Sequence, residues 1–155
     1  MMDIVTRSEK ETMALGCAVG RVLESGQCLA LQGDLGAGKT HFVQGIAQGM
    51  GIREPIVSPT FTILNYYEHE IPLQHFDFYR LEEEEELDAL GFDEYVEQGV
   101  TVIEWAEKFP TRIPTEAAQV YIEKTGEHTR VFHFVGNSPY WDKVKKEVEQ
   151  YAISH

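Results

Sequence analysis

The segment from Gly33 to Thr40 constrains the fold more than any other part of the chain. It reads Gly33-Asp34-Leu35-Gly36-Ala37-Gly38-Lys39-Thr40 and matches the phosphate-loop pattern G-x-x-x-x-G-K-[ST] in full. Residues 28–31 before it form a continuous apolar run typical of a strand buried on both faces. Residues 39–50 after it have helical spacing, and Gly49 and Gly51 are expected to end that helix. A glycine-rich surface turn requires neither neighbour. We therefore interpret the segment as a phosphate-binding loop between a buried strand and a helix.

The residue types in this loop suit a nucleotide that carries Mg²⁺. Glycines allow successive backbone N–H groups to converge on a phosphate, and the helix that begins near Lys39 adds its positive end. Lys39 is expected to contact the β- and γ-phosphates, while the Thr40 hydroxyl is expected to complete the octahedral shell of the metal. We therefore predict that all the loop residues from Gly33 to Thr40 bind ATP or ADP, with Mg²⁺ as a second cofactor.

Two carboxylates at strand ends are candidates for the metal side of such a site. Glu104 follows a continuous β-branched run at residues 100–103, which suits a central buried strand. Asp77 follows residues 73–76, which alternate more and are expected to be half-exposed. Strand character therefore favours Glu104 as the metal-side acid, and Asp77 would share the metal or orient the attacking water. For each acid, an ordinary strand-end carboxylate in solvent is the alternative.

Two further residues are candidates by position. Thr60, within Ser58-Pro59-Thr60-Phe61, lies after the expected phosphate-loop helix, where NTPases often place a switch that senses the γ-phosphate. Its hydroxyl would bind Mg²⁺ or the γ-phosphate, and a plain strand-initiating turn is the alternative. Trp105 follows Glu104 directly and either lies near the nucleotide or packs in the core.

The rest of the chain alternates between helical and strand patterns. Helices are expected at residues 8–26, after a capping box at Ser8 and Glu11, and at residues 82–90 and 139–150. Strands are expected at 61–67, 73–78 and 100–105, with a hairpin at 119–123 and 129–135. These elements predict one α/β domain over residues 1–155. Its fold would be a P-loop NTPase-like three-layer sandwich with a mostly parallel central sheet and antiparallel additions.

Charge and cysteine content exclude several classes of protein. The 26 acidic residues against 13 Lys and Arg give a net charge of −13, which disfavours autonomous binding of RNA or DNA. Eleven of the acids lie between residues 82 and 107, as a solvated helix face or as a docking surface for a basic partner. The two cysteines, Cys17 and Cys28, suit buried thiols, and no stretch approaches the ~18 apolar residues that span a bilayer. We expect a soluble, cytoplasmic protein.

The motifs favour ATP over GTP and hydrolysis over transfer to a metabolite. The D-x-x-G pattern at residues 88–91 closes an acidic helix instead of following a buried strand, and the N-K-x-D guanine motif is absent. A small-molecule kinase is the main alternative, because it uses the same loop. Such kinases surround two sets of phosphates with arginines, often on a lid, whereas the six arginines here are scattered singly and no lid segment is evident.

Four motifs in this order resemble the bacterial TsaE (formerly YjeE) family over about residues 8–105. They are the loop at 33–40, Ser58-Pro59-Thr60-Phe61, His75-Phe76-Asp77-Phe78-Tyr79-Arg80-Leu81, and Glu104-Trp105. The resemblance implies a cytoplasmic P-loop ATPase, weak on its own, that binds a heterodimer of a transferase subunit and its paralogous partner. That machinery makes threonylcarbamoyladenosine next to the anticodon in tRNA, so tRNA would be reached only indirectly.

The resemblance also implies roles for individual residues. Lys39 and Thr40 would hold the phosphates and Mg²⁺, and Thr60 would belong to the switch. Asp77 and Glu104 would serve metal binding and catalysis, with Trp105 beside the nucleotide, and which of the two acids touches the metal stays open. A second hypothesis is a nucleotide-gated binding module in which turnover is incidental.

Overall fold

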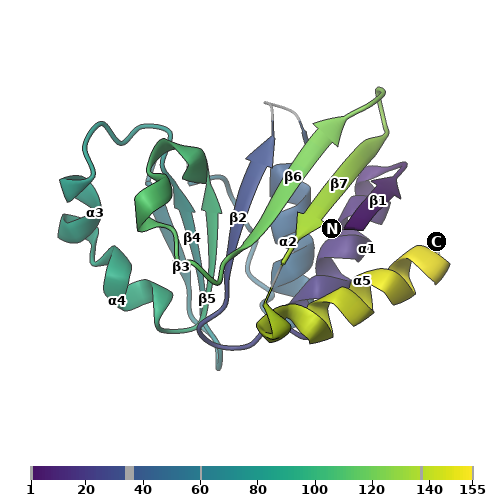
Figure 1. The fold of residues 1–155 in the computed structure, drawn as a ribbon, viewed down its shortest axis with the longest axis horizontal. Helices are drawn as coiled ribbons and strands as arrows, with labels where there is room; N and C mark the ends of the chain where they lie inside the picture. The colour runs from purple at the N-terminus through teal and green to yellow at the C-terminus, as the bar shows by residue number, and fades with distance from the viewer. Residues whose placement is uncertain (1, 34–36, 60, 137, 155) are drawn as a thin grey trace.

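The computed structural model describes residues 2–33, 37–59, 61–136 and 138–154, which form one mixed sheet flanked by helices (Figure 1). The strand order is β1-β7-β6-β2-β5-β4-β3. The strands are β1 Met2–Thr6, β2 Cys28–Gly33, β3 Leu64–Tyr67, β4 Leu73–Asp77, β5 Val100–Glu104, β6 Ala118–Lys124 and β7 Arg130–Val135. The helices are α1 Glu9–Gly20, α2 Lys39–Met50, α3 Glu85–Leu90, α4 Phe92–Val96 and α5 Asp142–Ser154, with 3₁₀ turns η1 Ala106–Lys108, η2 Pro110–Arg112 and η3 Pro139–Trp141.

The centre of the sheet is parallel, and its margins are antiparallel. Strand β2 runs parallel to β5 and β6, and β5 runs parallel to β4, whereas β1–β7, β6–β7 and β3–β4 are antiparallel pairs. Helices α1, α2 and α5 pack on one face, and α3 and α4 cover the β4–β5 end of the other. The predicted three-layer α/β fold is therefore confirmed.

Strand β2 lies in the middle of the core and is buried on both faces, as its apolar run predicted. Leu29 and Leu31 belong to the cluster on the α1–α2 side, while Cys28 and Ala30 belong to the cluster on the α3–α4 side. Residues 28–31 are buried, and the strand then becomes partly exposed toward its end, Gly33, at the carboxyl edge of the sheet. In open α/β sheets, ligands bind at that edge.

Helices α1 and α2 touch through their backbones at four glycines, Gly16 and Gly20 in α1 and Gly45 and Gly49 in α2. A Cβ atom at Gly20 would lie 2.1 Å from the Ile46 carbonyl oxygen, and one at Gly45 would lie 2.1 Å from the Met13 oxygen. The expectation that Gly49 helps to end α2 is wrong, because this residue lies inside the helix at the crossing. Gly51, with φ of 89°, ends the helix in the left-handed conformation.

Several element boundaries differ from the sequence-based expectations. The N-terminal residues form strand β1, which pattern alone did not predict, because its five residues gain their hydrogen bonds from the distant strand β7. Helix α1 keeps the predicted Ser8 cap but ends at Gly20, where the glycine crossing stops. Strand β3 begins at Leu64 instead of residue 61, because residues 61–63 form a turn with Ile63 at φ of 68°.

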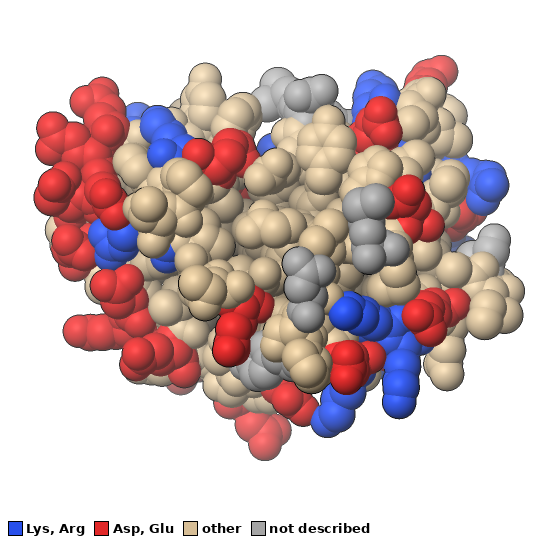
Figure 2. Space-filling model, in the orientation of Figure 1, with Lys and Arg blue, Asp and Glu red and all other residues tan. Residues whose placement is uncertain are grey.

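The acidic segment also differs from its expected form. Helix α3 begins at Glu85 and not at residue 82, because the Glu86 carboxylate accepts the backbone N–H groups of Glu82 and Glu83 at 2.8 and 3.0 Å. Gly91, with φ of 76°, then turns the chain into α4, a helix that the periodicity did not reveal. The α3–α4 end of the molecule is covered by acidic side chains (Figure 2).

Arg112, in the turn η2, forms ion pairs with acidic side chains of α3 and α4. Its guanidinium donates to Asp88 at 2.8 Å and to Asp93 at 3.1 Å, and these hydrogen bonds, led by that of Asp93, raise the pKa of Arg112. The acidic residues are therefore partly neutralised within the chain.

The expectation that Asp77 ends a half-exposed strand is wrong. All five residues of β4 are buried, including its polar side chains. Gln74 accepts a hydrogen bond from Thr101 of β5 at 3.1 Å, and His75 pairs with Glu104 of β5 at 2.6 Å. A polar side chain can be buried when a partner on the neighbouring strand replaces its hydrogen bonds to water.

Both cysteines of the chain are free thiols. Cys17 and Cys28 form no disulfide, and the expected burial holds for Cys28 but not for Cys17, which is half-buried. Loss of water contact raises the pKa of the Cys28 thiol to about 12, so it stays protonated and unreactive.

Across the described ranges, no helix has both the length and the apolar composition needed to cross a bilayer.

His133 connects β7 to the edge strand β1 and makes stability depend on pH. Its ring nitrogens lie 2.8 Å from Asp3 and 3.3 Å from Glu123, and these hydrogen bonds, led by that of Asp3, raise the pKa of His133. The stabilisation is therefore complete below pH ~6.5, the ordinary histidine pKa, and is lost as the pH rises through the folded-state value.

We expect His133→Gln to lower the melting temperature at pH 6 by about 1–3 °C, because exposed ion pairs contribute about 0.2–1 kcal/mol. The difference from the unsubstituted protein should shrink toward pH 8.5 in thermal melts followed by circular dichroism. His128→Gln, in the exposed hairpin, serves as the control and should show no such trend. A His133→Gln difference that stays constant with pH would contradict this assignment.

Candidate functional site

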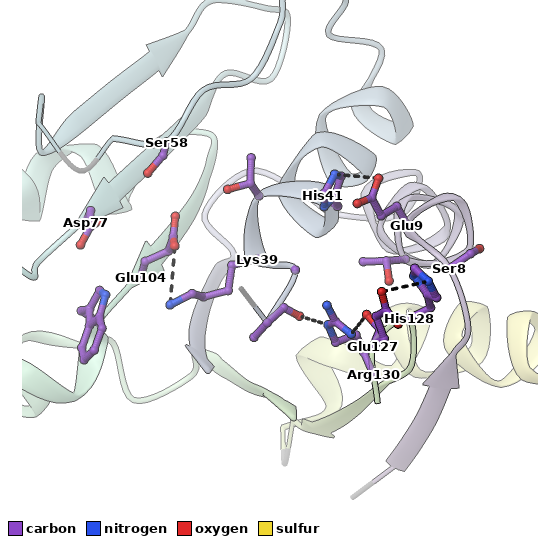
Figure 3. Close-up of a pocket in the computed structure, with 15 residues that line it drawn as sticks. Ser8, Glu9, Lys39, His41, Ser58, Asp77, Glu104, Glu127, His128 and Arg130 are labelled. Carbon is purple, nitrogen blue, oxygen red and sulfur yellow. Dashed lines mark hydrogen bonds and ion pairs between the residues drawn. The ribbon is translucent and has the colours of Figure 1, made fainter. Parts of the chain in front are cut away.

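The carboxyl ends of β2, β5 and β4 bring predicted site residues to one edge of the sheet. In the register of these strands, Glu104 is opposite Leu31 of β2 on one side and Asp77 of β4 on the other. A cleft of about 430 Å³ opens there, lined by Lys39, Thr40, Asp77, Glu104 and Trp105 among others (Figure 3). Parallel pairing thus unites residues that are up to 66 positions apart in the chain, from Lys39 to Trp105.

Lys39 is held by three contacts at the start of α2. Its Nζ donates to the Gly33 carbonyl oxygen at 2.9 Å, lies 3.9 Å from Glu104 Oε1 and lies 5.1 Å from the centroid of the Trp105 ring. The Lys39 side chain is only 10% exposed, so its charge faces the cleft from a fixed position. Trp105 therefore lines the cleft wall, while it also packs at the margin of the core beside α3 and α4.

The backbone before α2 has the form that an anion site needs. Gly38 has φ of 97°, a left-handed conformation that L side chains rarely adopt, and no side chain caps the 12-residue helix. The first amides of α2 are thus directed toward the cleft. Asp34, Leu35, Gly36 and Thr60 lie outside the described residues, and the roles predicted for them stay predictions.

The two acids are both nearly buried but are held differently. Glu104 is 5% exposed, and its Oε2 lies 2.6 Å from His75 Nε2. Asp77 is 3% exposed, and its Oδ1 accepts the backbone N–H of Tyr79 at 2.9 Å. Neither is an ordinary solvent-facing carboxylate. Together with the Lys39 ammonium, the Thr40 hydroxyl and the helix amides, they form a donor set suited to a phosphate with a divalent cation.

The segment around the predicted switch is connected to Asp77 through the backbone. The Ile63 N–H donates to the Pro59 carbonyl at 2.6 Å, and the Asp77 N–H donates to the Ile63 carbonyl at 2.8 Å. Ile63 is one of two non-glycine residues with positive φ in the described ranges, and the other is Trp105, directly after Glu104. A β-branched or bulky residue in this conformation is strained, so Glu104 precedes one strained residue and Asp77 is hydrogen-bonded to the other.

A second half of the cleft lies on the other side of Lys39 (Figure 3) and was not predicted from the sequence. Arg130, at the start of β7, donates through Nε to the Ala37 carbonyl at 3.1 Å and through Nη1 to the Thr129 carbonyl at 2.9 Å. Residues of the α1 region, of α2 and of the turn between β6 and β7 also line this wall, namely Ser8, Glu9, Thr12, His41, Glu127 and His128. Arg130, Ser8 and Thr12 are far from the loop in sequence and belong to no phosphate-binding pattern, so only the tertiary fold brings them to the cleft.

A parallel-centred α/β sheet with a glycine loop between β2 and α2 at its carboxyl edge defines a protein of the P-loop NTPase-like class. The sequence model of the family described as "Threonylcarbamoyl adenosine biosynthesis protein TsaE" matches residues 6–132. This chain belongs to the TsaE family.

Individual relatives agree with this assignment. The chain is 43% identical over 136 residues to the "tRNA threonylcarbamoyladenosine biosynthesis protein TsaE" of Bacillus subtilis, covering 85% of each chain. It is 46% identical over 121 residues to the protein of the same name from a Nostoc species, covering 74% of each. The crystal structure of YdiB from Bacillus subtilis superposes with a TM-score of 0.82 at 33% identity, covering 97% of this chain and 95% of that one.

Proposed function

We propose that this protein binds ATP with Mg²⁺ in the cleft and hydrolyses it to support threonylcarbamoyl modification of the adenosine next to the anticodon in tRNA. One observation carries the chemical part of the proposal. The Lys39 ammonium is fixed at the start of α2 between the Gly33 carbonyl and Glu104, with Asp77 on the adjacent strand. The names of the relatives support the tRNA part.

The residues that line the cleft would have different roles according to their position. Lys39, the loop amides and Thr40 would bind the phosphates and the metal, and Glu104 would be the metal-side acid, with Asp77 beside it. When bound, Mg²⁺ would neutralise the negative charge that develops on the transferred phosphoryl group. Trp105 and the wall formed by Arg130 would enclose the nucleotide on its two sides, which excludes water from the reacting atoms.

The charge of the chain supports an indirect contact with tRNA. The net charge of −13 opposes a phosphate backbone, and acidic side chains cover the α3–α4 end of the molecule (Figure 2). We propose that the tRNA is bound by a transferase subunit and its paralogous partner, and that this protein binds their heterodimer. ATP hydrolysis would then drive or reset that complex.

The arginines support hydrolysis over transfer to a metabolite. Among the described residues that line the cleft, Arg130 is the single arginine. Arg112 instead binds the acidic side chains of α3 and α4. A small-molecule kinase needs several arginines around the phosphates of donor and acceptor.

The direct test is ATP hydrolysis measured for the protein alone, with the transferase heterodimer, and with the heterodimer plus tRNA. We expect slow hydrolysis alone and strong stimulation by the partners. The proposal fails if a small metabolite is phosphorylated far faster than ATP is hydrolysed, or if the partners change nothing.

We expect Glu104→Gln to retain ATP binding and to lower the rate of hydrolysis by about 100-fold or more, the lower range for loss of an acid or base in the transition state. Hydrolysis is measured by phosphate release and binding by calorimetry. Glu107→Gln, at an exposed position three residues away, is the matched control and should behave as the unsubstituted protein.

The same variant separates hydrolysis from nucleotide-gated binding. If Glu104→Gln binds ATP, does not hydrolyse it and still sustains repeated rounds of tRNA modification, then turnover is incidental and the protein acts as a binding module. A variant that supports a single round only would agree with the proposal.

A further inference from the structure

We propose that His75 is a positioning residue that holds one oxygen of the Glu104 carboxylate, so that the other oxygen alone faces Lys39 and the cleft. This inference deepens the proposed function and rests on it, because it gives the orientation that Glu104 needs as the metal-side acid. None of the motif-based roles included His75.

The contact between the two side chains is short and fully enclosed. His75 Nε2 lies 2.6 Å from Glu104 Oε2, and the His75 side chain is 0% exposed. A carboxylate has no proton to donate, so the imidazole donates its Nε2–H to Oε2. Charge-assisted hydrogen bonds of this length are stronger than neutral ones and restrict the acceptor to one geometry.

The position of His75 in the sheet explains why it reaches Glu104. Strands β4 and β5 are parallel, with His75 opposite Val102 and Asp77 opposite Glu104. Side chains on a strand alternate between faces, so His75 and Asp77 lie on the same face, as do Val102 and Glu104. The imidazole therefore lies beside the Glu104 carboxylate on the side away from the strand end.

This hydrogen bond keeps Glu104 from closing on Lys39. The two charged groups are 3.9 Å apart, longer than the ≈ 2.7–2.9 Å of a hydrogen-bonded ammonium–carboxylate pair. With Oε2 bound to His75, the carboxylate stays separate and Lys39 keeps its bond to Gly33. Without His75, the Glu104 carboxylate would move toward Lys39, its nearest cation, and the two charged groups would pair with each other.

Pairing of the two strands does not by itself require a histidine here. On the opposite face of the same strands, Gln74 and Thr101 already form a buried hydrogen bond at 3.1 Å. Further, His75 Nδ1 has no hydrogen-bond partner among the described residues, which is a cost that an apolar side chain would avoid. The hydrogen bond between its Nε2 and Glu104 therefore explains why a histidine stands at this position.

The test compares His75→Leu, His75→Gln and Gln74→Leu with the unsubstituted protein, each with the transferase heterodimer present. Removing a side chain that orients a metal-side ligand typically lowers activity by about 10–100-fold, and we expect this loss in the rate of ATP hydrolysis of His75→Leu. His75→Gln, whose amide N–H replaces Nε2–H, should recover most of the rate. Gln74→Leu is the matched control, because it removes the cross-strand bond on the other face, and its rate should not change.

A crystal structure of His75→Leu provides a readout that does not depend on activity. We expect the Glu104 carboxylate to rotate and to approach Lys39 Nζ to hydrogen-bonding distance. Glu104 in its original orientation, or normal hydrolysis by His75→Leu, would overturn the inference, as would an equal loss in Gln74→Leu. If the unsubstituted protein hydrolyses no ATP, the proposed function fails, and the orientation of Glu104 in the His75→Leu crystal still decides this inference.

Discussion

Replacing Lys39 with alanine is expected to weaken ATP binding by about 100-fold or more. Lys39 would give up its hydrogen bond to the Gly33 carbonyl and bind two phosphates, and each hydrogen bond to a charged group contributes about 1.5–3 kcal/mol. No other lysine lines the cleft among the described residues. Isothermal titration calorimetry with ATP and Mg²⁺ measures the change directly.

Lys143→Ala is the matched control, since it removes a lysine that pairs with Glu24 at the surface, 2.7 Å away and outside the cleft. Its affinity for ATP should equal that of the unsubstituted protein. Both variants should melt close to the parent temperature, because neither removes a packed apolar group. Normal ATP affinity in Lys39→Ala would remove the phosphate-loop assignment.

The second large effect is expected at the crossing of α1 and α2. In Gly45→Ala, the new Cβ would lie 2.1 Å from the Met13 carbonyl oxygen and 3.0 Å from the Cys17 nitrogen, both backbone atoms that no rotamer change can move. The helices must separate, and overpacking against backbone atoms costs about 3 kcal/mol, the upper end of the usual range. For a chain of this size, we expect a melting temperature lower by roughly 6–12 °C.

Gln48→Ala in the same helix introduces the same residue at an exposed position, and its melting temperature should change little. Differential scanning calorimetry of the two variants isolates the contribution of the crossing. An unchanged melting temperature for Gly45→Ala would mean that the two backbones are not in contact in solution.

Local sequence was sufficient to predict the parts of the site that lie within one motif or at one strand end. The apolar run of β2 identified this strand correctly. The spacing of the glycines and the lysine in the eight-residue loop placed Lys39 at the start of the following helix, and the role of the loop in phosphate binding stays a prediction. The carboxylates Asp77 and Glu104 were found because parallel strands end at the same edge of a sheet. Their places in the cleft follow from that topology.

Other features depend on contacts that no local pattern encodes. Residues of β4 were expected to be half-exposed, because Gln74 and His75 are polar, yet each finds its partner on β5, nearly 30 residues later. Arg130 approaches Ala37 across 93 residues of chain. Gly49 was interpreted as a helix end, although a repeat of Gly-x-x-x-Gly in both helices is a sequence signal for close crossing.

The glycine crossing also determines which parts of the cleft are free to move. At the four glycines, backbone lies against backbone with no side chain between that could absorb sliding, so α1 and α2 are expected to move as a single rigid body. That body carries Thr12 and Thr40, and so two parts of the cleft lining. Opening and closing around a nucleotide would then fall to the opposite wall, where Ser58 lies beside the strained turn at Ile63.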